Sequence, residues 1–174
     1  RLRQIAWLVT GFTVGHSLTL ALAATGRVRP DMPAVEALIG FTVMVVAAEF
    51  LYLRSDRRAL IRWSATAALL AFGALSFAGF GVVDPLVFVG LALFVACYWA
   101  LLHSEEQARR LAPVLTVAFG LIHGFGFANV LADIGLPQGR MLTALLAFNL
   151  GVEVGQLLVV AVVVAVAAGL GSLV

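Results

Sequence analysis

Six long apolar runs, separated by short polar stretches, constrain this chain more than any other feature. The runs cover residues 4–24, 34–53, 62–80, 85–102, 112–132 and 141–165. A helix needs about 20 apolar residues to span the hydrocarbon core of a bilayer. Lipid offers no partners for backbone polar groups, so such segments form helices. The sequence therefore predicts an all-α, polytopic membrane helix bundle with six transmembrane helices in one domain, residues 1–174.

The composition supports this class and excludes others. Hydrophobic residues make up 63% of the chain and charged residues 11%, against about 25% charged residues in soluble domains. The alternating polarity of a transmembrane β-barrel is missing, and no internal repeat is evident. The predicted partner is the lipid bilayer, not nucleic acid. Cys97 is the only cysteine, so we expect neither a disulfide framework nor a cysteine-pair metal site.

The basic residues predict the orientation in the membrane. Eight arginines belong to one predicted side, and three belong to the other. The first group is Arg1, Arg3, Arg54, Arg57, Arg58, Arg62, Arg109 and Arg110, and the second is Arg27, Arg29 and Arg140. Cytoplasmic loops carry the excess of basic residues. Both ends of the sequence are therefore predicted to be cytoplasmic.

Two histidines lie deep inside apolar runs. His16 is roughly 18 Å from the start of its segment, and His123 is roughly 15 Å beyond Pro113, at the rise of an α-helix. Gly120 and Gly124 share one helix face beside His123, which favours close approach of another helix. A buried histidine needs a partner. A backbone carbonyl or a serine would satisfy it as well as a metal would.

The last segment carries three polar side chains on one face: Asn149, Glu153 and Gln156. An ionised carboxylate near the middle of the membrane is costly unless it is paired or binds a cation. A protonated Glu153 bonded to a neighbour is the alternative. Gly151 and Gly155 lie on another face, where we expect them to seat a neighbouring helix.

The second segment contains Glu36 near one end and Glu49 near the other. They are too far apart along a helix to share one ion. Glu36 could reach the membrane interface, and Glu49 could pair with an arginine of the basic loop that follows. Both are also candidate cation ligands.

The joint pattern is more informative than any single residue. His16, His123 and Glu153 come from three segments and reach similar depth. Two imidazole nitrogens and a carboxylate suit divalent transition metals such as nickel, cobalt, zinc or copper(II). We therefore expect the first, fifth and sixth segments to pack together, with the two histidines within about 12 Å of each other, because direct ligands lie only about 2 Å from an ion.

Four motifs resemble the HupE/UreJ membrane protein family. They are FTVGHSLTL at 12–20, VEALI at 35–39, FGLIHGFGF at 119–127 and FNLGVEVGQ at 148–156. The resemblance implies a nickel permease of the bacterial inner membrane, associated with hydrogenase and urease accessory genes. It also implies metal handling by His16 and His123, and by the polar residues Glu36, Glu49, Asn149, Glu153 and Gln156.

One departure from the family pattern affects the predicted site. Family members usually have an earlier helix with a glycine, aspartate and histidine motif, and this chain begins at Arg1 without it. If a seventh helix of this kind was lost upstream, the predicted site lacks two ligands.

Three classes of function fit the residues. The first is a permease with a divalent metal ion as its substrate and no catalytic site. The second is a structural or accessory subunit of a larger membrane assembly, whose polar residues bond helices together. The third is an intramembrane hydrolase with a pair formed by Ser17 and His123. A second copy of the chain or another membrane protein remains open as a partner.

Overall fold

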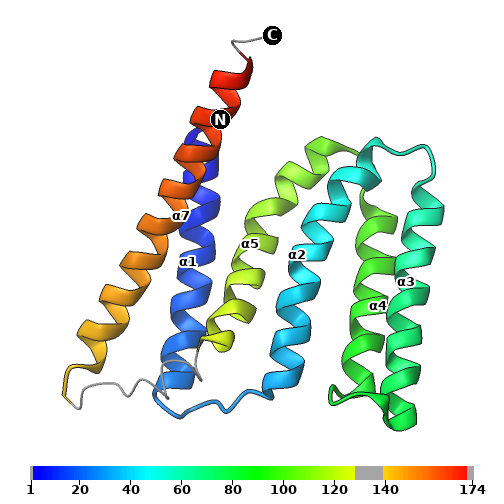
Figure 1. Cartoon of the computed structure of the whole chain (residues 1–174), viewed down its shortest axis with the longest axis horizontal. Coiled ribbons are helices and arrows are strands. Elements are labelled where there is room, and N and C mark those ends of the chain that lie inside the picture. The colour runs from blue at the N-terminus through cyan, green and yellow to red at the C-terminus, as the bar shows by residue number, and fades with distance from the viewer. Residues whose placement is uncertain (1, 128–138, 172–174) are drawn as a thin grey trace. The chain divides into compact units, whose positions relative to one another are not determined.

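The structure is a computed structural model that describes residues 2–127 and 139–171 (Figure 1). Its elements, in chain order, are α1 (Leu2–Ala24), α2 (Met32–Arg54), α3 (Arg58–Leu75), the π-helical segment η1 (Ser76–Phe80), α4 (Pro85–Leu101), α5 (Glu105–Gly126) and α7 (Met141–Gly171). The described part contains six α-helices and no strand, and 87% of it is helical. The predicted all-α fold is confirmed.

The helices have the length and surface of membrane spans. Four are long and apolar enough to cross a bilayer, namely Arg3–Ala24, Met32–Arg54, Arg58–Phe80 and Met141–Gly169. α4 is also apolar but has 17 residues, about 25 Å of helix. Large apolar side chains point outward, with Phe77 exposed to 85% and Leu142 to 72%. Surfaces of this kind are stable against lipid tails, so the protein is a multi-pass membrane protein.

The fifth predicted segment begins earlier than expected. α5 starts at Glu105 and includes the polar stretch before Pro113, which lies outside the predicted range of 112–132. The Ser104 hydroxyl accepts a hydrogen bond from the Gln107 backbone N–H at 3.2 Å, as the spacing of a capping box predicts. Pro113 lies inside the helix, where it removes one backbone donor without ending it. Residues 128–132 of the predicted segment lie outside the described residues.

The chain forms two compact units. The first contains Arg1–Arg29 and Pro113–Val174, and therefore α1, most of α5 and α7. The second contains Pro30–Ala112, with α2, α3, η1, α4 and the start of α5. The organisation of 1–174 as a single domain remains a prediction, and each unit is described by itself.

In the first unit, α1 and α5 touch backbone to backbone. Gly120 lies against the Phe12 carbonyl, and Gly124 lies against the His16 carbonyl. Gly15 makes the reciprocal contact with the backbone of α5. The contact moves from Phe12 to His16 on α1 as it moves from Gly120 to Gly124 on α5. The two helices therefore run parallel. The predicted close contacts of Gly120 and Gly124 are confirmed.

α7 lies antiparallel to α1 in the same unit. Leu20 and Leu145 form a buried cluster, covered by Met141 and Phe148, and further along the pair His16 of α1 meets Asn149 of α7. The predicted association of the first, fifth and sixth segments is therefore confirmed. Parallel α1 and α5 with an antiparallel α7 match a chain that crosses the membrane alternately.

The second unit is built on a helical hairpin. α3 approaches α4 where Gly73 contacts the Cβ of Phe88, and the Asp84 carboxylate caps α4 by accepting from the Leu86 N–H at 2.8 Å. On α4, Trp99 is fully buried and stacks on Tyr52 of α2, with ring centroids 5.2 Å apart. Aromatic stacking thus joins α2 to the hairpin.

Charged groups gather at one end of this unit. Arg54, at the end of α2, pairs with Glu105 at the start of α5 at 3.2 Å. The Arg58 guanidinium donates to the His103 carbonyl at 3.0 Å. The polar segments that follow α2 and α4 therefore lie together, as the arginine pattern predicts.

Candidate functional site

His16 is the most deeply buried ionisable side chain of the first unit, with 1% of its surface exposed. It shares its helix face with Thr13, Thr19 and Leu20, which are buried as well. Their spacing of three, four and seven residues places them on the side of α1 that meets its neighbours. The sequence therefore presents this imidazole to the interior and not to lipid.

Asn149 of α7 is the partner of one ring nitrogen. The His16 Nδ1 and the Asn149 Oδ1 lie 3.0 Å apart. The Asn149 amide nitrogen donates to the Leu145 carbonyl at 2.8 Å. The other ring nitrogen, Nε2, is buried and has no hydrogen-bond partner among the described residues. A buried nitrogen of this kind needs an explanation, because such groups are normally paired.

Three phenylalanine rings surround the His16 imidazole. Phe12 and Phe148 stack on it with centroid distances of 6.1 Å each, and Phe127 approaches edge-on at 5.5 Å. These rings come from α1, α7 and the residue after α5. They keep the surroundings of His16 apolar, which strengthens any electrostatic interaction made there.

His123 approaches the same aromatic ring from α5. Its imidazole lies edge-on to Phe12 with a centroid distance of 5.2 Å, and Phe12 also stacks on His16. Because both imidazoles contact one phenyl ring, they satisfy the predicted limit of about 12 Å. The geometry brings together the two histidines that the sequence singles out.

Glu153 and Gln156 extend the polar contacts between α7 and α1. The Thr10 hydroxyl donates to Glu153 Oε1 at 2.8 Å, and the Thr13 hydroxyl donates to Gln156 Oε1 at 3.5 Å. Together with Asn149 they form a polar ladder on one face of α7, as their spacing predicts. The sequence analysis missed both threonines, although they precede His16 by six and three residues on one helix face.

No group of three or more His, Cys, Asp or Glu side chains is arranged to hold a metal in residues 2–127 and 139–171. Glu153 faces Thr10, which lies about 9 Å along α1 from His16 at the rise of an α-helix. The three-ligand set of His16, His123 and Glu153 therefore remains a prediction.

The two other predicted carboxylates belong to the second unit. Glu36 is exposed on the first turns of α2. Glu49 is half-buried and accepts a hydrogen bond from the Tyr98 hydroxyl at 2.6 Å. The neighbouring Arg54 pairs instead with Glu105. The partner of Glu49 is therefore the Tyr98 hydroxyl, and not an arginine of the basic loop as the sequence suggested.

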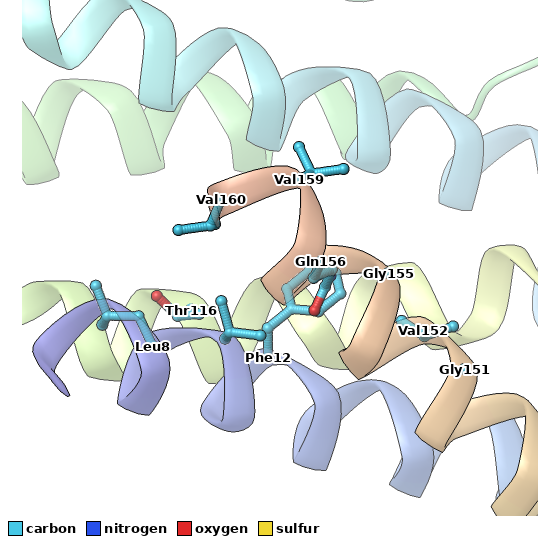
Figure 2. A pocket seen from close by; sticks show the side chains of 10 residues that line it. Leu8, Phe12, Thr116, Gly151, Val152, Gly155, Gln156, Val159 and Val160 are labelled. Carbon is cyan, nitrogen blue, oxygen red and sulfur yellow. The ribbon is translucent and has the colours of Figure 1, made fainter. Parts of the chain in front are cut away.

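A groove of about 540 Å³ opens on the first unit beside this polar ladder (Figure 2). Phe12 and Gln156 line it, and so do Gly151 and Gly155 of α7. A Cβ built at either glycine would meet no atom within 4 Å among the described residues. The prediction that Gly151 and Gly155 seat a neighbouring helix is wrong here, because their face of α7 is the open wall of the groove.

The comparisons with known proteins agree with this architecture. A family model described as HupE / UreJ protein matches the chain over residues 1–93 and again over residues 82–173. This family is associated with nickel or cobalt transport or with accessory functions, and it is not an enzyme family. No curated protein and no solved structure matches the chain. Because the two matches together cover almost every residue, the chain belongs to the HupE/UreJ family.

Proposed function

We propose that this protein is a permease of the bacterial inner membrane that carries a divalent transition metal ion, with nickel as the first candidate. The observation that supports it most is the buried His16 imidazole, whose Nε2 has no hydrogen-bond partner within residues 2–127 and 139–171. A neutral imidazole nitrogen is a good ligand for borderline metals. Cobalt, zinc and copper(II) share this preference.

In this proposal the two histidines and Glu153 act in sequence along the first unit. His16 and His123 offer nitrogen donors, and both contact the Phe12 ring; Glu153 supplies negative charge one turn of α7 from Asn149. A few mixed donors hold an ion weakly enough to release it, as permeation requires. Asn149 and Gln156 offer amide oxygens, and the exposed Glu36 would attract cations at the far end of α2, opposite Glu49.

The arginine bias supports an orientation with both ends of this sequence in the cytoplasm. Glu36, near the start of α2, would face the periplasmic side.

An accessory subunit without transport is the second candidate, and one observation favours it. Three polar contacts join α1 to α7, through Glu153, Gln156 and Asn149. Hydrogen bonds of this kind can serve helix association alone. The hydrolase alternative is weaker, because the Ser17 hydroxyl donates to the Thr13 carbonyl of its own helix at 2.6 Å and not to a histidine.

Substitution of Glu153 by glutamine separates the two candidates. Glu153→Gln keeps the shape and an oxygen acceptor for Thr10 while it removes the charge. For a permease, we expect nickel flux into proteoliposomes to fall on the order of tenfold or more. The measurement is entry of nickel against a metal-sensitive dye inside the vesicles, normalised to folded protein.

Leu150→Ala is the matched control, because Leu150 is next to Asn149 and 65% exposed to lipid. Its flux should equal that of the wild type. Wild-type flux in Glu153→Gln would remove Glu153 from the pathway. Vesicles with wild-type protein that admit no nickel, cobalt, zinc or copper would support the accessory subunit.

A further inference from the structure

The orientation of the Asn149 amide follows from its own helix. Its nitrogen donates to the Leu145 carbonyl at 2.8 Å, and a carbonyl oxygen can only accept. The amide oxygen must therefore be the atom that faces His16 Nδ1 at 3.0 Å. Reversing the amide would place its oxygen against the Leu145 oxygen and its two hydrogens against the ring.

This orientation determines which ring nitrogen of His16 carries hydrogen. An amide oxygen only accepts, so the Nδ1 that faces it must donate. In a neutral imidazole the other nitrogen, Nε2, then carries the lone pair. That atom is the one buried without a partner among the described residues. The imidazole that carries it is contacted by the side chains of Phe12, Phe127 and Phe148.

We propose that Asn149 is a positioning residue that holds His16 in the Nδ1–H tautomer, so that Nε2 is the atom that binds the passing cation. The proposal rests on the proposed function and assigns Asn149 a different task from that of a ligand. Histidines that bind metals commonly donate their second ring N–H to a fixed acceptor, which sets the tautomer and the ring orientation. Here the Leu145 carbonyl fixes the acceptor in turn.

The test compares three forms of the full-length protein. Nitrogen NMR of ¹⁵N-histidine-labelled protein without metal reports the tautomer of His16, identified by its loss in His16→Gln. We expect the wild type to show the Nδ1–H tautomer. Asn149→Asp keeps an acceptor oxygen and should keep this tautomer, whereas Asn149→Leu removes the acceptor and should give a mixture of both tautomers.

Nickel affinity, measured by titration of the same samples, should follow the tautomer. Loss of such an outer partner lowers metal affinity by about 10- to 100-fold, so we expect a loss of this size in Asn149→Leu. The control Leu150→Ala should change neither readout. If the leucine variant fails to fold, Asn149→Asp remains as the comparison: it keeps an acceptor oxygen for Nδ1 and should retain the tautomer, and the Nε2–H tautomer in this variant would contradict the proposal.

The Nε2–H tautomer in the wild type would overturn the proposal, and so would an unchanged tautomer in a folded Asn149→Leu. Failure of the proposed function has a different signature. A wild type that keeps the Nδ1–H tautomer but binds and carries no metal would overturn the permease and leave the role of Asn149 in orienting the ring supported.

Discussion

At the scale of residues, the buried polar groups differ in how they are satisfied. Thr66 donates to the Arg62 carbonyl of its own helix at 2.9 Å, which is common for threonine in membrane helices. Trp99 has a buried Nε1 without a partner among the described residues. An indole N–H is only a donor, so it cannot bind a cation. The His16 Nε2 can, and this chemistry distinguishes it from the other buried polar groups.

The histidines could be predicted from the sequence, whereas the threonines could not. A histidine deep in an apolar run is rare enough to stand out. Thr13 also bonds the Val9 carbonyl of its own helix at 3.2 Å. Because threonine can be satisfied in this way, its sequence position alone does not predict a contact such as that between Thr10 and Glu153.

Tyr98 gives a prediction at this scale. Tyr98→Phe removes the hydroxyl that donates to Glu49 at 2.6 Å. We expect the free energy of unfolding to fall by about 1–3 kcal/mol, because a hydrogen bond to a carboxylate is lost in a half-buried place. The measurement is unfolding of the detergent-solubilised protein. Cys97→Ala, at an exposed position, is the control, and equal stability of the two variants would contradict the prediction.

At the scale of elements, the two histidines share one local feature. Phe12 precedes His16 by four residues, and Phe119 precedes His123 by four residues. A spacing of four places each phenylalanine on the same helix face as its histidine. The neighbouring residues differ between the two motifs, so the shared spacing does not amount to an internal repeat.

Glycine spacing predicted some helix contacts and not others. Gly120 and Gly124 meet the backbone of α1, whereas Gly151 and Gly155 line a groove. Spacing of four shows that two glycines share a face. It does not show whether that face meets a helix, because the partner is chosen by the packing of the whole unit.

These glycines provide a matched pair of substitutions. The Cβ of Gly120→Ala would collide with the Phe12 carbonyl, so we expect a loss of stability of about 1–3 kcal/mol. Gly151→Ala has open space and should stabilise its helix by about 0.5–1 kcal/mol. Thermal unfolding in detergent compares them, and a Gly120→Ala protein as stable as Gly151→Ala would refute the close contact.

At the scale of the whole molecule, the six helical segments were predictable because lipid requires long apolar runs. Helix boundaries agree within a few residues except in α5, which also includes the polar stretch before Pro113, and in α7, which continues to Gly171, six residues beyond the predicted end. The orientation of the helices in the membrane is predicted from the uneven distribution of arginines between the two sides. The fold alone would be the same in either orientation.

Cysteine labelling tests that orientation in a Cys97→Ala background. Asp31→Cys precedes α2, and Arg57→Cys lies in the basic loop after it. A membrane-impermeant maleimide should label Asp31→Cys in cells with a permeable outer membrane, and Arg57→Cys only after the inner membrane is opened. Labelling in the reverse order would invert the topology.

The two kinds of contact in the first unit have a mechanical consequence. α1 and α5 touch mainly through backbone atoms at Gly15, Gly120 and Gly124, and backbone atoms cannot change rotamer to let the helices slide, so the two helices behave as one rigid pair. α7 is held to α1 by hydrogen bonds such as that of His16 with Asn149. Side-chain hydrogen bonds can break and re-form without any change in the backbone of either helix, so α7 is the helix of this unit that can shift at the lower cost.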